Sequence, residues 1–475
     1  MVKRTKIVAT IGPSSSSKKT IKHFIENGVN LFRFNFKHNN QQWHEHYIDL
    51  VYVISKRLGK NVGTIADLQG PSLRTGVLEN DKPILLKKGD MVVLSKEKLN
   101  YTDIHIPFNQ IDDIKSLKLG SSIFIADGVI ELITTKFTKD YIKAKVEQGY
   151  TLGSRKSINI SHGEFNLPSL TAKDKTDVKT AVKKNMEYAA LSFVRDKKDV
   201  NALRKYIKSL DGKLGIISKI ETGKAVENID EIIEASDAIM VGRGDLGIEI
   251  AIERVPKIQK EIIKKCREKA VPVIVATQML KSMVENPLPT RAEVADIANT
   301  VMLDRTDAIM LSEESATGKY PEKAVVTMAK IARYNEHDIN EISQIDTTYN
   351  IKSFQDLIIL SALRFSQVNI PKDHIKGYIV FTESGRSART LSRYRCNTPI
   401  FAFTQNIESH KKLALSWGVE SFFLKLSQNP VINIKQALYL LKRKRVVEAD
   451  DKVVIIFGSN VGVEESNNTL SVLTI

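Results

Sequence analysis

The sequence predicts an α/β fold made of a (β/α)8 TIM barrel, an inserted β-barrel lid domain and a C-terminal α/β domain. Three observations support this prediction. Eight short apolar runs alternate with helix-length segments up to residue 340, a long β-rich stretch interrupts them after Asp67, and a new alternation follows residue 350. We therefore expect a barrel domain in two parts (1–70 and 169–340), an inserted lid domain (71–168) and a C-terminal domain (350–475).

The eight apolar runs have the length and composition of parallel strands that are buried on both faces. In chain order they are TKIVATI (5–11), NLFRFNF (30–36), VGTIAD (62–67), YAALSF (188–193), LGIISKI (214–220), AIMV (238–241), VPVIVAT (271–277) and AIMLS (308–312). Segments between them, such as KKTIKHFIENG and VPKIQKEIIKKCREKA, have helical patterns. This order of elements is typical of a (β/α)8 barrel.

Polar or charged residues stand at the carboxyl ends of all eight runs. They are Thr10, Arg33 with Asn35, Asp67, Ser192, Lys219 with Glu221, Arg243 with Asp245, Thr277 and Ser312. In a (β/α)8 barrel these ends meet at one mouth, where the active site lies. Solubility alone does not explain polar residues at all eight strand ends. The pattern therefore predicts an active site at this mouth.

Lys219, Glu221 and Asp245 are the most informative of these residues. Lys219 and Glu221 are two positions apart, so on a strand their side chains point to the same face. Asp245 follows the next strand along the chain. Two carboxylates and an ammonium suit a Mg²⁺ ion next to a phosphoryl group. A surface Lys–Glu pair is the alternative, but the apolar flanks favour a buried site.

The same region contains a glycine pattern that resembles a dinucleotide-binding fingerprint. Gly242 to Gly247 fit G-x-G-x-x-G after a strand. Such a site requires a second strand that ends in an acidic residue about 20 residues later. A helix, KIQKEIIKKCRE (257–268), follows instead, and the next strand ends at Thr277. The sequence therefore argues against a dinucleotide site.

The segments outside the barrel predict a lid and a third domain. The inserted segment has alternating β-rich runs such as PILLKKGDMVVLS, and its position at the mouth suits a lid that excludes water. The polar segment 337–350 reads as a linker. In the C-terminal domain the loop 382–387, TESGRS, lies between a strand and a helix. It suits either phosphate binding or an ordinary capped turn.

The composition predicts a cytoplasmic protein without a membrane segment. The chain has 475 residues and two widely separated cysteines, Cys266 and Cys396, which excludes a disulfide framework. No apolar stretch has the length of a membrane helix or a signal peptide. The net charge of +16 is spread along the chain. We therefore expect a solvated lysine-rich surface and no nucleic-acid partner.

The chain resembles pyruvate kinase along essentially its whole length. The segments that carry the resemblance are TKIVATIGPSS, FRFNF, DLQGPSLRTG, ADG (126–128), LGSRKSIN, LPSLTAKD, SKIE, VGRGDLGIE, VATQMLKSM, PLPTRAEVADIAN, DAIMLSEESATGKYP and SGRSA. The order SKIE, GRGDLG, ATQML and PTRAEV is nearly diagnostic. The resemblance implies phosphoryl transfer from phosphoenolpyruvate to ADP, followed by protonation of enolpyruvate to pyruvate.

The resemblance also implies roles for single residues. Glu221 and Asp245 would hold Mg²⁺, while Lys219 and Arg33 would contact the transferred phosphoryl group. Backbone N–H groups of Gly244 and Asp245, with the hydroxyl of Thr277, would bind the substrate carboxylate. Ser312 and Glu314 match a proton-relay position, with Thr277 near the carbon that is protonated. The expected nucleotide contacts are Thr10, Pro13, His38, Arg74, Asp127 and Lys156.

The first departure from the family pattern concerns the site of the monovalent cation. Many pyruvate kinases bind K⁺ through an Asn, a Ser, an Asp and a carbonyl. Here Asn35, Asp67 and Leu68 are present, but Lys37 stands at the serine position. We expect the Lys37 ammonium to replace the ion, which makes K⁺ doubtful as a cofactor; the alternative is that Lys37 points into solvent and K⁺ binds weakly.

The second departure lies in the C-terminal phosphate loop. Its residues Thr382, Ser384, Gly385, Arg386 and Ser387 would bind a sugar-phosphate or nucleotide effector, but Glu383 stands among them. Because a carboxylate next to a phosphate lowers affinity, we expect weak or altered activation. A third departure, Asp304-Arg305 in place of Asp-Gly, loses the conformational freedom of glycine. The family further implies a homotetramer.

Other functions fit the sequence less well. A catalytically silent sensor would not need Arg33, Lys219, Glu221, Asp245 and Thr277. A different Mg²⁺-dependent enzyme acting on an enolate would leave the lid and the nucleotide contacts without a purpose. A nucleic-acid binder has only the net charge in its favour.

Overall fold

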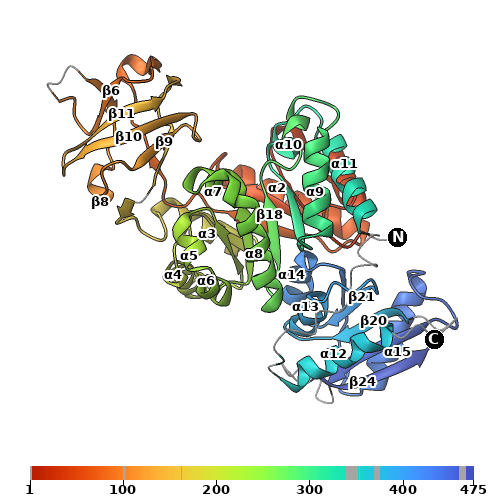
Figure 1. Ribbon diagram of the computed structural model, residues 1–475. Coiled ribbons are helices and arrows are strands. Elements are labelled where there is room, and N and C mark those ends of the chain that lie inside the picture. Colours follow the sequence, from red (N-terminus) through yellow and green to blue (C-terminus); the bar gives the residue numbers. More distant parts are fainter. Residues whose placement is uncertain are drawn as a thin grey trace.

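The computed structural model describes residues 3–99, 103–161, 163–336, 351, 353–367, 375–458 and 467–475. A closed barrel lies in the middle of the molecule, a β-domain lies beyond one end of it, and an α/β domain lies beyond the other (Figure 1). The barrel strands are β1 (Lys6–Thr10), β2 (Leu31–Asn35), β3 (Gly63–Asp67), β15 (Tyr188–Leu191), β16 (Gly215–Ile220), β17 (Ala238–Gly242), β18 (Val273–Ala276) and β19 (Ala308–Leu311).

All eight barrel strands run parallel, and β1 pairs with both β2 and β19, which closes the ring. The strands are the eight predicted apolar runs; seven are shorter than predicted by one to three residues, and β17 extends one residue further, to Gly242. Their register sets polar residues side by side at the mouth, for example Asn35 opposite Asp67. The predicted fold class is therefore confirmed.

Helices cover the outside of the barrel. They are α1 (Lys18–Glu26), α2 (Gln41–Leu58), α3 (Ala172–Lys183), α4 (Lys197–Ser209), α5 (Gly223–Glu227), α6 (Ile229–Ala235), α7 (Arg243–Glu249), α8 (Val255–Glu268), α9 (Arg291–Met302), α10 (Glu313–Ala316) and α11 (Pro321–Asn335). In α8, Ile258, Ile262 and Cys266 recur at four-residue spacing and are buried against the strands. Side-chain caps start several helices; in α3, Thr171 and Asp174 form a reciprocal capping box.

The inserted segment between β3 and β15 folds into its own β-domain with a separate apolar core. Its strands are β4 (Leu73–Arg74), β5 (Ile84–Leu85), β6 (Met91–Ser95), β7 (Ile104–Pro107), β8 (Ile114–Leu117), β9 (Ser122–Ile125), β10 (Ile130–Phe137), β11 (Tyr141–Gln148), β12 (Thr151–Leu152), β13 (Ser157–Ile160) and β14 (Gly163–Phe165). Seven of them form a sheet in the order β4-β13-β9-β10-β11-β6-β7. The Gly76 N–H donates to the Pro107 oxygen at 2.6 Å, so the two ends of this sheet meet.

The C-terminal domain has a five-stranded sheet in the order β22-β21-β20-β23-β24. Its elements are α12 (Phe354–Gln367), β20 (Ile375–Phe381), α13 (Arg386–Ser392), β21 (Ile400–Thr404), α14 (Ile407–Lys412), η7 (Leu413–Leu415), β22 (Val419–Phe423), α15 (Pro430–Arg443), β23 (Lys452–Gly458) and β24 (Asn467–Thr474). Ala414 and Leu415 share a core cluster with barrel residues such as Val8 and Ile65. This domain therefore seals the end of the barrel opposite the mouth.

Other expectations from the sequence concern the linker, the domain boundaries, Arg305 and membrane helices. The linker expected at 337–350 lies outside the described residues, and the domain boundaries stay a prediction. Arg305, which stands where the family has glycine, takes the left-handed conformation with φ of 59°. Among the described helices, none is long and apolar enough to cross a membrane.

Candidate active site

Arg33, Asp67 and Lys219 form a charged group at the barrel mouth. Arg33 Nε donates to Asp67 Oδ2 at 2.5 Å, and Lys219 Nζ lies 3.3 Å from Asp67 Oδ1. Burial acts to raise the pKa of Asp67, but the charges of Lys219 and Arg33 outweigh it and hold that pKa below its usual value. Asp67 is therefore an ionised, buried carboxylate that holds two cations side by side.

Lys219 is fixed at the end of β16 by further contacts. Its Nζ donates to Ser192 Oγ at 2.7 Å and lies 2.9 Å from Glu221 Oε1. The Ser192 hydroxyl in turn donates to the Leu68 carbonyl oxygen at 2.8 Å. Burial acts to lower the pKa of Lys219, but Asp67 and Glu221 raise it above its usual value. Lys219 therefore stays positively charged at any physiological pH.

Glu221 and Asp245 are two carboxylates at the barrel mouth that act on each other electrostatically. Glu221 Oε2 accepts the Phe193 N–H at 3.0 Å, and a Cβ at Gly242 would lie 2.7 Å from Glu221 Cγ. Glycine at 242 therefore makes room for this carboxylate next to the first turn of α7, where Asp245 lies. Burial and the charge of Glu221 raise the pKa of Asp245 to about 6. This repulsion, and the preference of Mg²⁺ for carboxylate oxygens, fit a divalent-cation site.

Thr277 is in a strained conformation next to the start of α7. Its φ is 70°, which is rare for a β-branched residue, and the structure around it enforces this value. The Gly244 N–H donates to Thr277 Oγ1 at 2.9 Å, while Arg243 Nη2 donates to the Thr277 carbonyl oxygen at 2.7 Å. The structure thus brings together the hydroxyl and the backbone N–H that were expected at the substrate carboxylate.

Ser312 and Glu314 lie at the end of β19. Glu314 is 2% exposed, and its two carboxylate oxygens accept the N–H groups of Ser312 at 2.7 Å and of Leu280 at 3.2 Å. The carboxylate therefore ties the loop after β18, which carries Thr277, to the loop after β19. In this structure Glu314 positions Ser312 through the backbone.

The loop between β2 and α2 carries Asn35, Lys37 and His38. Asn35 Oδ1 accepts the Lys37 N–H at 3.2 Å. Burial and the charge of Arg74 lower the pKa of Lys37, whereas Asp245 and Asp127 act to raise it. The Lys37 ammonium thus lies within the electrostatic field of both the barrel mouth and the inserted domain. Burial, Lys37 and Arg33 lower the pKa of His38.

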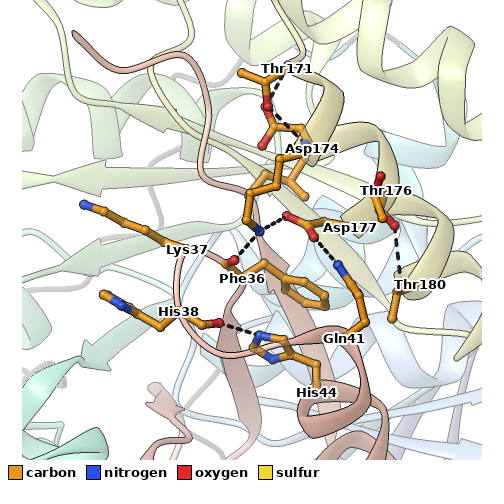
Figure 2. A network of polar contacts seen from close by, with 12 residues as sticks. Phe36, Lys37, His38, Gln41, His44, Thr171, Asp174, Thr176, Asp177 and Thr180 are labelled. Carbon is orange, nitrogen blue, oxygen red and sulfur yellow. Dashed lines mark hydrogen bonds and ion pairs between the residues drawn. The ribbon is translucent and has the colours of Figure 1, made fainter. Parts of the chain in front are cut away.

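A polar network supports this loop from α3 and α2 (Figure 2). Lys173 Nζ donates to the Phe36 oxygen at 2.5 Å and to Asp177 Oδ2 at 2.7 Å, and Gln41 Nε2 donates to Asp177 Oδ1 at 2.5 Å. His44 stacks on Phe36 with ring centroids 4.1 Å apart. Figure 2 shows that the Lys37 and His38 side chains point away from this network. The network fixes the backbone and leaves both side chains available to a ligand.

The expected nucleotide contacts are distributed over the barrel and the inserted domain. Thr10 accepts from Arg33 Nη1 at 3.0 Å, and Pro13 is exposed in η1 (Pro13–Ser15) just after β1. In the inserted domain Arg74 Nη1 donates to the Arg155 oxygen at 2.9 Å, and Asp127 Oδ1 accepts from Ser157 at 2.9 Å. Lys156 is exposed. A Cβ at Gly128 would lie 3.5 Å from Ile248 of α7, so this face of the inserted domain touches the mouth.

The C-terminal loop 382–387 lies far from these residues, in the domain at the other end of the barrel (Figure 1). Gly385 has φ of 78°, and its N–H donates to Thr382 Oγ1 at 3.1 Å. Ser387 accepts from Gln355 and Asn467, whereas Arg386 is exposed. The loop is therefore ordered by its own contacts; Arg386 is exposed, and Glu383 and Ser384 are half-buried.

Two functional contacts were not anticipated from the sequence. Ser192 was recognised only as a polar strand end, yet it is a direct partner of Lys219. Lys173 was part of a matching motif without an assigned role, yet it holds the Phe36 carbonyl. The position of Ser192 at a strand end could have indicated its partner, whereas no sequence signal links Lys173 to the β2–α2 loop.

Comparison with known proteins identifies relatives over the whole chain. A family model described as pyruvate kinase, barrel domain, matches residues 2–325, and one described as pyruvate kinase, alpha/beta domain, matches residues 367–473. A pyruvate kinase of Clostridium acetobutylicum is 37% identical over 473 residues, which cover 99% of this chain and 99% of that protein. A pyruvate kinase of Staphylococcus epidermidis is 35% identical over 475 residues, which cover 99% of this chain and 80% of that protein.

A solved structure agrees with these relatives. The crystal structure of a pyruvate kinase from Cryptosporidium parvum matches with a TM-score of 0.90 and 32% sequence identity. The match covers 99% of this chain and 96% of that one. The order of the three structural units is thus shared over the full length.

Proposed function

The chain belongs to the pyruvate kinase family, and we propose that the charged residues at its barrel mouth carry out the transfer of a phosphoryl group from phosphoenolpyruvate to ADP. The observation that carries the proposal is the ion-paired set Arg33, Asp67, Lys219 and Glu221 at adjacent strand ends. Such a set meets the main demand of phosphoryl transfer, which is positioning and charge neutralisation.

Arg33 and Lys219 neutralise the transferred group. Both cations are held on Asp67, so they are pre-oriented and need little rearrangement when negative charge develops on the phosphoryl oxygens. Ser192 fixes the direction of the Lys219 ammonium at 2.7 Å. Arg33 presents a planar set of donors, which suits the phosphoryl oxygens.

Glu221 and Asp245 are the residues that would hold a divalent cation. Mg²⁺ bound there would supply further positive charge to the phosphoryl group. Of the two carboxylates, Glu221 is fixed by the Phe193 N–H and Lys219, whereas Asp245 lies in the first turn of α7. The family depends on a divalent metal, and the identity of Mg²⁺ in this chain is part of the proposal.

Thr277 and Gly244 orient the substrate for the second half of the reaction. The Gly244 N–H donates to the Thr277 hydroxyl oxygen at 2.9 Å, and both groups would bind the carboxylate of a bound substrate. We assign protonation of the enolpyruvate carbon to the Thr277 hydroxyl, with Ser312 as the next group of the proton relay. Glu314 keeps Ser312 in place through its N–H.

The inserted domain supplies the nucleotide side of the site. Arg74, Asp127 and Lys156 lie on the domain that touches α7, and Thr10, Pro13 and His38 lie on the barrel rim. A nucleotide bound between the two sets would close the site to water, as lids do in other phosphotransferases. We also expect a homotetramer, a cytoplasmic location and weak control by a sugar phosphate or nucleotide at Thr382–Ser387.

Lys37 replaces the monovalent cation in this proposal. Asp67 and Asn35, two of the expected K⁺ ligands, are already engaged by Arg33 and Lys219 and by the Lys37 N–H. The Lys37 ammonium, moreover, adds a positive charge in the field of Asp245 and Asp127. Both features favour catalysis without K⁺.

The test is pyruvate formation from phosphoenolpyruvate and ADP with Mg²⁺, in a buffer free of K⁺ and NH₄⁺ and then with K⁺ added. Wild type is expected to be fully active without K⁺. Lys37→Ser, which restores the family residue, is expected to need K⁺. A tenfold or larger stimulation of the wild type by K⁺ would refute the role of Lys37 but keep the phosphotransferase. Inactivity in both buffers would refute the proposed function itself.

A further inference from the structure

The inserted domain is connected to the barrel by two segments of chain, residues 68–72 and 166–171. The domain has an apolar core of its own, so its orientation over the barrel mouth depends on how these two segments are held. It carries Arg74, Asp127 and Lys156, which the proposed function assigns to the nucleotide. Whatever fixes the two segments therefore also sets where these three side chains lie relative to the barrel rim.

A single buried carboxylate, that of Asp174 at the start of α3, contacts both segments. Its Oδ1 accepts the N–H of Gly70 in the first segment at 3.1 Å. Its Oδ2 accepts the N–H and the hydroxyl of Thr171 in the second segment, at 2.9 and 2.7 Å. Figure 2 shows the Thr171 and Asp174 side chains in contact at the start of the helix. The two connections thus meet at one side chain, although Gly70 and Asp174 are 104 positions apart.

An ordinary helix cap explains only one of the two carboxylate oxygens. In a capping box the third residue of a helix accepts the N–H of the cap residue, and Thr171 and Asp174 form this reciprocal pair. Gly70 is not part of the helix, and its N–H uses the other oxygen. The carboxylate therefore has a second task, which is to attach the first segment to the barrel.

The Gly70 contact lies where the first segment passes from the barrel to the inserted domain. Before it, the Leu68 N–H donates to the Ala190 oxygen of β15 at 3.0 Å. After it, the Ser72 oxygen accepts from Gln110 of the inserted domain at 3.2 Å. The change of partners falls between Gly70 and Ser72, so Asp174 holds the segment next to the point where the domain can turn.

The first segment also packs against the phosphoryl site. Gly70 has φ of 68°, and a Cβ there would lie 2.9 Å from Ser192 Cβ. Only glycine fits this backbone conformation and this close approach without strain. Ser192 in turn contacts Lys219 at 2.7 Å. The attachment of Gly70 therefore fixes the inserted domain relative to the residue that meets the transferred group.

The second segment has further attachments at the start of α4. Arg195 Nη1 donates to the Leu167 oxygen at 3.0 Å, and Ser169 Oγ donates to Asp199 Oδ1 at 2.5 Å. This segment therefore stays on the barrel without Asp174. A loss of the Asp174 carboxylate acts mainly on the first segment.

The first turn of α3 also supports the opposite side of the nucleotide site. Lys173, next to Asp174, donates to the Phe36 oxygen in the loop that carries His38. One helix start therefore holds both the barrel loop and the connections of the inserted domain. The two sets of expected nucleotide contacts share this support.

We propose that Asp174 is a positioning residue that sets the orientation in which the inserted domain closes on the nucleotide. The inference rests on the proposed function for the nucleotide, whereas the attachment itself does not. Asp174 touches neither substrate, and it acts through Gly70 and Thr171. A carboxylate is suited to this task because it only accepts, and all three groups that it meets in the two segments are donors.

The test compares Asp174→Asn with Thr171→Val. Asparagine keeps the shape of the side chain but turns an NH₂ group toward one of the two segments, so one donor is left without an acceptor. Valine at 171 removes the hydroxyl of the same helix cap and leaves both backbone contacts with Asp174. We expect Asp174→Asn to raise KM for ADP at least about fivefold and KM for phosphoenolpyruvate less than about twofold. Thr171→Val should leave both KM values within about twofold of wild type.

A distance measurement decides on Asp174 without turnover, even if the proposed reaction fails. Spin labels are placed on Lys145→Cys in β11 and Lys205→Cys in α4, both exposed, while the native cysteines are buried. The distribution of distances between the labels should be at least about 1.5 times as wide in Asp174→Asn as in the wild-type background. Thr171→Val should keep the narrow distribution.

Hydrogen exchange of the wild type keeps the inference testable if Asp174→Asn folds poorly. The Gly70 N–H should exchange at least about tenfold more slowly than an unstructured amide, because Asp174 holds it. Exchange at the unstructured rate would overturn the inference. So would a folded Asp174→Asn protein with the wild-type distance distribution and KM for ADP, or equal changes in Thr171→Val, since Asp174 would then be a helix cap alone.

Discussion

Replacing Lys219 by methionine tests how the barrel mouth stabilises the transferred phosphoryl group. Methionine keeps the length and the apolar stem of the side chain but removes the ammonium, which lies 2.9 Å from Glu221, 3.3 Å from Asp67 and 2.7 Å from Ser192. A positive charge at the transferred phosphoryl group contributes about 10³ to 10⁵ in kcat in related reactions. We expect Lys219→Met to lower kcat by at least about 10³-fold.

The same change also has a predictable cost in stability. Removing one partner of a buried ion pair costs about 3 to 5 kcal/mol. Asp67 keeps Arg33 at 2.5 Å, so only Glu221 loses its cationic partner, and we expect the lower end of this range, about 3 kcal/mol. Lys219 is 13% exposed, so solvent compensates little.

The assay is pyruvate formation together with urea unfolding, with Lys224→Met as the matched control. Lys224 lies just after the same strand, is 62% exposed and pairs with Glu227 at 2.8 Å. Its replacement should leave kcat unchanged and cost less than about 0.5 kcal/mol. If folded Lys219→Met retains kcat within tenfold of wild type, the assigned role of Lys219 is refuted.

Three further predictions address other parts of the molecule. Burial raises the pKa of Glu249 from 4.5 to about 7, so the folded state binds its proton more tightly and stability falls as pH rises from 4.5 to 7; Glu249→Gln should therefore raise the melting temperature at pH 8 and leave it unchanged at pH 4. Arg395→Met leaves Asp307 buried without its cation and should lower the unfolding free energy by about 3 kcal/mol or more, measured in urea, whereas a loss below about 1 kcal/mol would contradict a tight domain junction. Glu383→Gln removes a carboxylate from the loop 382–387 and should lower the half-activating concentration of fructose 1,6-bisphosphate roughly threefold or more; no change would show that Glu383 does not face the effector.

Much of the barrel could be predicted because each strand is a short apolar run that ends in a polar residue. The eight predicted strands correspond to the eight barrel strands, and their polar ends lie at one mouth. The register places neighbouring strand ends side by side, since Asn35 lies opposite Asp67 and Lys219 lies opposite Met240. Local sequence therefore carries most of the information on the phosphoryl site.

The parts that were not predicted depend on contacts between distant segments. The strand β24 (Asn467–Thr474) was missed, because NNTLSVLT at a sheet edge is half exposed and has no long apolar run. The left-handed conformation of Thr277 contradicts the propensity of a β-branched residue and results from the surrounding fold. Neither the Lys173–Phe36 contact nor the Arg267–Arg393 contact between the barrel and the C-terminal domain has a local signature, since each joins residues more than 100 positions apart.

The most direct test of the proposed active site measures metal binding and catalysis in the same samples. Mn²⁺ is titrated into wild type, Glu221→Gln and the exposed control Glu227→Gln, free Mn²⁺ is followed by electron paramagnetic resonance, and pyruvate formation is then assayed. We predict that Glu227→Gln behaves as wild type, while Glu221→Gln binds Mn²⁺ at least about tenfold more weakly and loses at least about 100-fold in kcat. Wild-type Mn²⁺ affinity and turnover in Glu221→Gln would show that the carboxylates at the barrel mouth do not hold the metal.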